Sequence, residues 1–312
     1  MTDTLQVQGE FAPAESSFAA ETLAAAVVAD AAADAVTAEP NGFIELGLAP
    51  ELVQAVADLG YTQPTSVQLK AIPLAMGSGN DSTSFIDLMV SSQTGSGKTA
   101  AFLLPVLHTL IQQQAAAEAE ERAAFERAVA EAAARGEPAP KRAKRKGPTN
   151  SRNFKAATPG ALILCPTREL AQQVAHDAID LVKHCRGLRV ANVVGGMPYQ
   201  LQIAKLQNAT LVVATPGRLL DLQRSMQIKL DKVQFLVVDE ADRMLDLGFS
   251  DDLAELNQLT AQRKQTMMFS ATFAPRIQQL AMRVMHDGGA SVQKVTIDSP
   301  QEKHANIKQM LY

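Results

Sequence analysis

The sequence predicts an α/β domain with a mostly parallel central sheet and helices on both faces. Two observations predict this class: short apolar runs alternate with helical patterns, and most of the runs are continuously apolar instead of apolar at every second residue. Strands of this composition are buried on both sides, as in parallel sheets connected by helices. The predicted strands are Leu88–Ser91, Ala161–Cys165, Val190–Val194, Leu211–Ala214, Phe235–Asp239, Met267–Ser270 and Val292–Ile297.

The composition is compatible with one large domain plus extensions. The chain has 312 residues, of which 46% are hydrophobic, and this is enough to bury a full core. Its formal net charge is −4, but segment 1–41 contains seven acidic residues and no Lys or Arg. The remainder is therefore near neutral, and binding of a polyanion would depend on the local placement of Arg, Lys and backbone N–H groups.

The N-terminal segment 1–41 is Ala-rich and acidic, and we interpret it as a disordered tail. Glu21, Asp30 and Asp34 interrupt its Ala/Val stretch, which argues against a signal peptide or a membrane span. The chain has two cysteines, too few for a disulfide framework. We expect a soluble, cytoplasmic protein that does not bind a membrane.

Residues 111–158 are a second biased block, which we interpret as a helical and basic insertion. An Ala/Glu/Arg stretch with good helix propensity follows an expected helix over Ala100–Leu110 and continues to about Arg135. After a stretch with Gly and Pro, the run 141–146 has five cations in six residues. Such a run is commonly a solvated loop, and the alternative is a patch with non-specific affinity for a polyanion.

The first motif is a glycine-rich loop between a predicted strand and a predicted helix. Glycines let the backbone approach a phosphate closely, and the N-terminus of the helix presents free N–H groups to it. Lys98 would reach the β- and γ-phosphates, and the Thr99 hydroxyl would bind Mg²⁺. The general pattern has Gly in place of Ser92, and an ordinary Gly/Ser loop is the alternative. The nucleotide-binding residues predicted here are Ser92, Thr94, Gly95, Ser96, Gly97, Lys98 and Thr99.

The second motif is an apolar strand that ends in the paired carboxylates Asp239 and Glu240. Asp239 would bind Mg²⁺, and Glu240 would orient and deprotonate an attacking water. An acidic surface turn is the alternative. Because the glycine-rich loop and this strand end would be complementary halves of one Mg²⁺–nucleotide site, we predict Lys98, Asp239 and Glu240 as the catalytic residues.

Two further motifs each follow an apolar strand and begin a helix. They are Pro166-Thr167-Arg168-Glu169 and Thr215-Pro216-Gly217-Arg218. Thr hydroxyls, Arg guanidinium groups and helix N-terminal N–H groups bind phosphate without reading a base. Pro in a first helical turn is also common for structural reasons alone, so that interpretation stays open for either motif.

Together the motifs resemble those of the DEAD-box family of ATP-dependent RNA helicases, in particular bacterial, RhlE-like members. Asp239-Glu240-Ala241-Asp242 is similar to the motif that names the family. The segment from Gly60 to Gln68 resembles the family's Q motif, with Phe43 upstream at the usual spacing, and Ser270-Ala271-Thr272 resembles another family motif. The motifs occur in the family's order, and the resemblance covers residues 43–312 apart from the insertion.

The resemblance implies a RecA-like P-loop domain over residues 42–298 that binds ATP and Mg²⁺. It implies that Gln68 hydrogen-bonds adenine and that Phe43 stacks on it, although ordinary packing is the alternative for Phe43. Ser270 and Thr272 would hydrogen-bond Asp242 and so couple hydrolysis to strand separation. Sequence-independent binding of the RNA backbone would involve Pro166, Thr167, Arg168, Gly195, Gly196, Thr215, Pro216, Gly217 and Arg218.

The same resemblance implies that residues 299–312 are an interdomain linker and the first strand of a second RecA-like domain. The family's arginine fingers and remaining RNA motifs belong to that second domain. We therefore expect the chain to bind ATP but to hydrolyse it weakly and not to unwind duplexes. The basic run 141–146 would add affinity for RNA.

Two alternatives to a helicase acting on RNA stay open at this point. One is a non-catalytic, ATP-gated RNA clamp, and Glu240 argues against it because a binding module has no need of a carboxylate that activates water. The other is a DNA helicase, against which only the family resemblance argues.

Overall fold

The structure is a computed structural model, and it describes residues 41–77, 84–142 and 155–297. The tail predicted over 1–41 lies outside these ranges except for its last residue. Most of the basic run 141–146 and the linker predicted over 299–312 also lie outside them.

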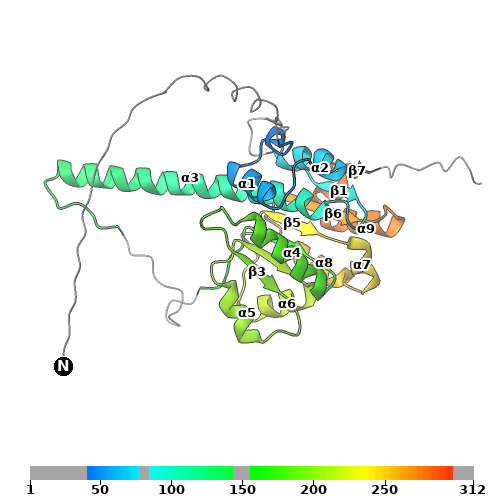
Figure 1. The fold of residues 1–312 in the computed structure, drawn as a ribbon. Coiled ribbons are helices and arrows are strands. Elements are labelled where there is room, and N and C mark those ends of the chain that lie inside the picture. The colour runs from blue at the N-terminus through cyan, green and yellow to red at the C-terminus, as the bar shows by residue number, and fades with distance from the viewer. Residues whose placement is uncertain (1–40, 78–83, 143–154, 298–312) are drawn as a thin grey trace, which may run out of the picture. The chain divides into compact units, whose positions relative to one another are not determined.

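Seven parallel strands form one sheet in the order β3-β4-β2-β5-β6-β1-β7 (Figure 1). Each strand corresponds to one of the predicted apolar runs, which confirms the predicted fold class, and every paired neighbour is parallel. The strands are β1 (Leu88–Ser91), β2 (Ala161–Leu164), β3 (Val190–Val193), β4 (Leu211–Ala214), β5 (Phe235–Val238), β6 (Gln265–Ser270) and β7 (Gln293–Thr296).

Strand β6 begins two residues earlier than predicted, at Gln265 and Thr266, both of which are buried. The Gln265 amide donates to the carbonyls of Ala75 and Ile86 at 3.0 and 2.8 Å. The Thr266 hydroxyl accepts a hydrogen bond from the Arg263 guanidinium at 2.6 Å. Since hydrogen bonds satisfy both polar side chains, they can lie in a buried strand that an apolar pattern does not detect.

Helices cover both faces of the sheet, as predicted. Val90 of β1 lies in a core layer with buried side chains of α1 to α4, whereas the neighbouring Met89 lies in a second layer with those of α5 to α9. Successive side chains of a strand point to opposite faces, so a continuously apolar strand such as β1 contributes to both layers. The helices are η1 (Ile44–Leu46), α1 (Pro50–Asp58), α2 (Ser66–Met76), α3 (Lys98–Ala134), α4 (Arg168–Leu181), α5 (Tyr199–Leu206), α6 (Pro216–Arg224), α7 (Ala241–Asp246), α8 (Ser250–Leu259), α9 (Pro275–Val284) and η3 (His286–Gly289).

Helix α3 is longer than predicted, because it does not end near Leu110 but continues without a break to Ala134 (Figure 1). The Ala, Glu and Arg residues of the expected insertion have high helix propensity and continue the helix that begins at the glycine-rich loop. Gly136 ends it in the left-handed conformation at φ 70°, and its N–H donates to the Ala133 carbonyl at 3.1 Å. Residue 111 is therefore not a structural boundary.

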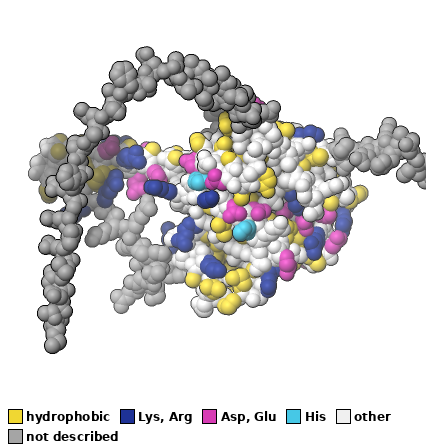
Figure 2. Space-filling model, viewed as in Figure 1, with side chains coloured by type: hydrophobic (Ala, Val, Ile, Leu, Met, Phe, Trp, Pro, Cys, Tyr) yellow, Lys and Arg dark blue, Asp and Glu magenta, His cyan; other side chains and the backbone are white. Residues whose placement is uncertain are grey.

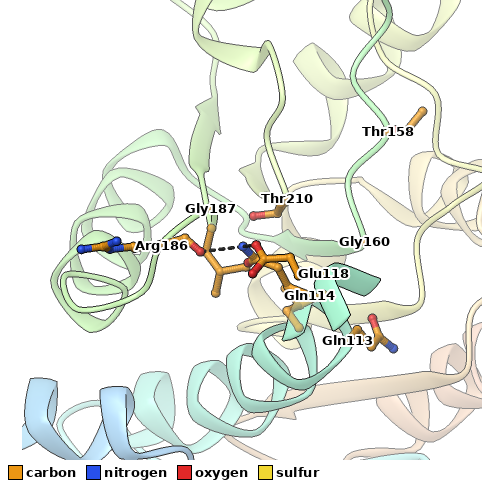
Figure 3. Close-up of a pocket in the computed structure, with 10 residues that line it drawn as sticks. Gln113, Gln114, Glu118, Thr158, Gly160, Arg186, Gly187 and Thr210 are labelled. Carbon is orange, nitrogen blue, oxygen red and sulfur yellow. Dashed lines mark hydrogen bonds between the residues drawn. The ribbon is translucent and has the colours of Figure 1, made fainter. Parts of the chain in front are cut away.

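A hollow lies between α3 and the loops that precede β2, β3 and β4 (Figure 3). Gln114 of α3 spans it and donates to the Arg186 carbonyl at 2.7 Å, while the Arg186 guanidinium points away (Figure 3). On the neighbouring side, the amides of Gln113 and Gln234 hydrogen-bond each other at 2.7 and 3.1 Å. The hollow is at the amino ends of the strands, and no predicted site residue lines it.

Charges of both signs are interspersed on the face seen in Figure 2, where Lys and Arg side chains lie among Asp and Glu. This view agrees with the near-neutral charge of the chain outside its tail. Within the described ranges, no helix is both long enough and apolar enough to span a bilayer.

Candidate functional site

A pocket lies at the carboxyl ends of β1, β5 and β6 and brings together motifs that are far apart in the sequence. Parallel strands place the loops that follow them at one edge of the sheet, so the glycine-rich loop after β1 and the acidic residues after β5 meet there. The residues that line the pocket are Ser92, Thr94, Lys98, Glu240, Asp242, Arg243, Ser270 and Ala271.

Lys98 joins the two predicted halves of the site. Its ammonium nitrogen lies 3.0 Å from Asp239 Oδ1 and 3.3 Å from Glu240 Oε1. Burial alone would lower the pKa of Lys98, but the charges of and hydrogen bonds to the two carboxylates outweigh it and raise that pKa. Burial raises the pKa of Asp239, although the nearby Lys98 opposes the change. The ammonium of Lys98 thus has two carboxylate partners, and one of these, Asp239, is buried.

Several buried oxygen atoms in and around the pocket have no hydrogen-bond partner. Among the described residues six buried side-chain atoms are of this kind, and four belong to predicted site residues: Ser92 Oγ, Ser96 Oγ, Asp239 Oδ2 and Ser270 Oγ. A buried polar atom without a partner is costly, so such a cluster is typical of a site that a ligand completes. A carboxylate oxygen and hydroxyl groups are ligands that Mg²⁺ accepts, so these residues fit a Mg²⁺–phosphate group.

The conformation of Glu240 is strained. Its backbone lies in the left-handed region at φ 48° and ψ 55°, which residues other than glycine rarely adopt. Its N–H donates to Asp239 Oδ1 at 3.0 Å, which helps to hold the turn between β5 and α7. Its side chain contacts Lys98 on one side and lies 3.6 Å from the Arg243 guanidinium on the other. Strain of this kind is found where a side chain must point into a functional site.

Gly97 lies at the start of α3 in the left-handed region, at φ 82°. A Cβ atom at this position would lie 2.6 Å from Gln68 Nε2 and 2.8 Å from Thr65 Oγ1. Gly97 is therefore needed both for its conformation and for the close approach of the segment that resembles the Q motif.

Gln68 has a structural role in this structure, and its predicted contact with adenine stays a prediction. Its side-chain oxygen accepts a hydrogen bond from the Thr65 N–H at 2.9 Å, and its amide donates to the Gly97 carbonyl at 3.1 Å. The residue is only 6% exposed. The side-chain oxygen of Gln68 completes a capping box at the start of α2. Its side-chain nitrogen connects α2 to the glycine-rich loop. Adenine recognition would use the hydrogen-bonding capacity that remains on this amide.

Phe43 is a core residue in this conformation. It is 1% exposed and packs in the layer that contains α1 to α4, so its ring has no free face for stacking on a base. Its position in this structure therefore agrees with the alternative stated above, ordinary packing in the core. Stacking on adenine would require the segment around η1 to move.

The predicted hydrogen bonds from Ser270 and Thr272 to Asp242 are absent. Asp242 and Ser270 line the same pocket, but within the described residues no hydrogen bond connects them, and Thr272 is exposed. Helices α7 and α9 are instead joined by an ion pair between Asp246 and Arg276. The hydrogen bond with Asp246 raises the pKa of Arg276.

The loops predicted to bind an RNA backbone lie together at the carboxyl ends of β2, β3 and β4. Arg168 is exposed at the start of α4, and Gly196 packs against its guanidinium, since a Cβ at Gly196 would lie 2.5 Å from Arg168 Nη1. The Thr167 hydroxyl accepts from the Leu170 N–H and caps α4. Pro166 and Pro216 are buried, whereas Gly195, Thr215, Gly217 and Arg218 are at least partly accessible.

The sheet order separates the two groups of loops. The pocket residues follow β1, β6 and β5, which are adjacent, and the other loops follow β2, β4 and β3. Strands β5 and β2 are neighbours, so the two groups adjoin at one edge of a single sheet.

Three residues of the site were not predicted from the sequence. Arg243 lines the pocket, and its position three residues after Glu240 on a helix could have indicated it. Thr65 is the N-cap of α2, and its spacing to Gln68 is a capping-box pattern that could have indicated it. The buried Gln202 is placed by contacts with segments distant in the sequence, and no local pattern distinguishes it.

Comparison with known proteins identifies relatives over most of the chain. Residues 65–280 match the family described as DEAD/DEAH box helicase. The chain is 36% identical to DEAD-box ATP-dependent RNA helicase 52A of Oryza sativa subsp. japonica, over 87% of this chain and 42% of the relative. It is 35% identical to RNA helicase CrhR of Synechocystis sp., over 86% of this chain and 44% of the relative.

Solved structures are similar as well. The structure of S. cerevisiae Dbp5 bound to RNA and ADP BeF3 matches with a TM-score of 0.58 and 28% identity, over 82% of this chain and 52% of that chain. The chain thus spans less than half the length of the two curated relatives named above and about half the length of this structure.

Proposed function

This chain belongs to the DEAD/DEAH box helicase family, and from that premise we propose that it is the nucleotide-binding half of an ATP-dependent RNA helicase. The whole protein would couple binding and hydrolysis of ATP to the opening of RNA duplexes or to the remodelling of RNA–protein complexes. The observation that supports this most directly is the junction of Lys98 with Asp239 and Glu240, where Asp239 Oδ2 is buried without a partner.

The residues of the pocket would divide the work of binding between them. The backbone N–H groups of the glycine-rich loop and the first turn of α3 would bind phosphate oxygens, and the Lys98 ammonium would contact the β- and γ-phosphates. Thr99 and Asp239 would hold Mg²⁺, which when bound neutralises phosphate charge. Gln68 would contact adenine, and Phe43 would do so only after it leaves its core position.

Glu240 would act as the general base. Its side chain lies at the mouth of the pocket, held between Lys98 and Arg243, so it can orient a water and accept its proton. Once Lys98 contacts phosphate, its interaction with Glu240 weakens, and the carboxylate is free for this role. Asp242, Ser270 and Thr272 would couple the nucleotide site to the RNA-binding loops, with the Asp246–Arg276 pair as a second connection between α7 and α9.

The loops after β2, β3 and β4 would bind the RNA backbone without reading sequence. Arg168 and Arg218 would supply cationic donors, and Gly195, Gly196 and the first turns of α4 and α6 would supply N–H groups. We also propose a RecA-like domain over 42–298, a linker from residue 299, a second RecA-like domain as partner, and a cytoplasmic location. Because arginine fingers would come from that second domain, this chain alone should hydrolyse ATP weakly.

The proposal can be tested with fluorescently labelled ATP and three variants. We expect Lys98→Ala to weaken binding at least about tenfold, because it removes a charge-assisted contact. Lys205→Ala removes an exposed lysine of α5 and should leave binding unchanged. In the longer protein Glu240→Gln should bind ATP normally and lower turnover by about 100-fold or more.

Each outcome distinguishes between the alternatives. If Lys98→Ala binds ATP as tightly as the unmodified chain, the proposal that this pocket binds ATP is wrong. Equal turnover of Glu240→Gln and the unmodified protein would favour an ATP-gated clamp. Competition between matched RNA and DNA strands decides whether the substrate is RNA.

A further inference from the structure

A buried glutamine lies beneath the loops that follow β2, β3 and β4. Gln202 is on α5, in the first turn after Tyr199, and its side chain is 0% exposed, whereas the adjacent Leu201 is 45% exposed. An amide in an apolar environment destabilises the fold unless its donor and acceptor are both hydrogen-bonded. The partners of Gln202 therefore indicate why a polar residue occupies this position.

The two ends of the Gln202 amide connect two different loops. Its nitrogen donates to the carbonyl of Val194, the residue directly before Gly195. Its oxygen accepts a hydrogen bond from Arg218 Nη1 at 3.1 Å. Gln202 thus connects the loop between β3 and α5 to the first turn of α6.

Arg218 holds the same loop at a second point. Its Nη1 also donates to the Met197 carbonyl at 3.1 Å, and its guanidinium lies 5.2 Å from the centre of the Tyr199 ring. The backbone from Val194 to Met197 is consequently fixed at both ends, by Gln202 and by Arg218.

The third loop is connected through Gly196. This glycine lies in the left-handed region at φ 78°, and the Arg168 guanidinium packs against it so closely that even a Cβ atom would collide with Arg168 Nη1. The position of Arg168 thus depends on the path of the loop that Gln202 fixes. Gln202, Arg218 and Gly196 form a continuous set of contacts from α6 to α4.

From these contacts we propose that Gln202 is a positioning residue for RNA binding, which sets the relative positions of Arg168, Gly196 and Arg218 without touching RNA. The proposal rests on the RNA-binding role proposed above. A phosphate backbone has a fixed spacing, so donors from three loops bind it well only if they are already held at matching positions.

The chemistry of the amide makes the proposal specific to glutamine. Gln202→Met keeps the length and apolar stem of the side chain but removes both hydrogen bonds. Gln202→Glu keeps the acceptor for Arg218 and places a carboxylate oxygen against the Val194 carbonyl, where the donor was. Gln207→Met is a matched control, because Gln207 follows the same helix and its amide donates only to the Ile203 carbonyl of that helix.

The test measures the affinity of the chain for labelled single-stranded oligouridylate at low salt, and for labelled ATP in parallel. We expect Gln202→Met to weaken RNA binding about tenfold, because binding must then order donor groups that Gln202 otherwise holds in place. Gln202→Glu should be intermediate, and Gln207→Met should bind as the unmodified chain does. ATP affinity should be unchanged in all three, since the nucleotide pocket lies on other strands.

Two further measurements separate positioning from a general loss of structure. Amide hydrogen exchange of Gly195, Gly196 and Met197 should accelerate in Gln202→Met, whereas exchange of β5 should not change. The RNA affinity of the double variant Gln202→Met/Arg218→Lys should equal that of whichever single variant binds RNA less tightly. The two effects should not add, because both substitutions disrupt the same connected set of contacts.

The outcomes distinguish this proposal from the proposed function. If the unmodified chain does not bind the RNA at all, the RNA-binding part of the proposed function fails and the positioning role fails with it. If the unmodified chain binds and Gln202→Met binds equally well, only the positioning role is overturned. Parallel losses of RNA and ATP affinity, or unchanged amide exchange of Gly195, Gly196 and Met197, also overturn it.

Discussion

The ammonium of Lys98 lies 3.0 Å from Asp239, a carboxylate that is completely buried at the end of β5. Lys98 begins α3 and Asp239 directly follows β5, so this ion pair connects the glycine-rich loop to the acidic motif. Because phosphate and metal would compete for the same two groups, the pair also indicates that ligand binding rearranges contacts that already exist.

The first prediction concerns Gly97 and Gly95, which have nearly the same left-handed φ, 82° and 81°. Gly97→Ala should destabilise the fold by about 2–3 kcal/mol and weaken ATP binding, because its Cβ collides with Gln68 and Thr65 in addition to the backbone strain. Gly95→Ala has no atom within 4 Å of its new Cβ and should cost only about 1 kcal/mol of strain. Urea unfolding of both variants checks this difference, and equal losses would contradict the close approach of Gln68.

The second prediction concerns the strained backbone of Glu240. Glu240→Gly should raise the free energy of unfolding by about 1 kcal/mol, since glycine adopts the left-handed conformation without strain. Glu240→Gln keeps the strain and should leave stability nearly unchanged. Both variants should lower turnover in the longer protein by about 100-fold or more. A thermal unfolding temperature of Glu240→Gly at or below that of Glu240→Gln would show that the turn is not strained.

The third prediction concerns Asp58, whose carboxylate joins α1 to the end of α4. Hydrogen bonds from His184 and Gln54, together with the nearby Lys183, lower the pKa of Asp58 from 3.8 to about 2. A folded-state pKa below the unfolded value contributes stability that is fully present above the unfolded pKa and is lost as pH falls through the folded one. The contribution of Asp58 should therefore disappear as the pH falls from about 4 to about 2.

Asp58→Asn tests this dependence by urea unfolding at several pH values. The variant should be less stable than the unmodified chain at pH 7, and the two should converge as the pH falls toward 2. Asp231→Asn changes an exposed carboxylate before β5 and serves as the control. The free energies of unfolding of Asp58→Asn and the unmodified chain could also differ by the same amount from neutral to acidic pH. That result would exclude ionisation of the Asp58 carboxyl group as the source of the difference.

The sheet and the meeting of the two nucleotide motifs could be predicted from the sequence because both depend on local patterns. Strands buried on both faces are mostly apolar, and parallel strands bring the residues after Ser91 and Val238 to one edge. The start of β6 was missed because Gln265 is satisfied by carbonyls distant in the sequence.

The roles of individual polar residues were harder to predict for the same physical reason. Gln68, Gln202 and Arg218 each have partners in another loop, and a single sequence does not specify which donor meets which acceptor. The length of α3 was missed because a change in composition at residue 111 suggested a boundary, whereas helix propensity on both sides is compatible with one continuous helix.

The unbroken path of α3 from Lys98 to Ala134 has a mechanical consequence. A helix of 37 residues is about 55 Å long, so a tilt of one degree at its first turn displaces its last turn by about 1 Å. Any tilt of α3 that accompanies a reorientation of the glycine-rich loop would therefore be largest at the far end of the helix. A spectroscopic label near Ala130 would test whether nucleotide binding at the glycine-rich loop tilts the helix.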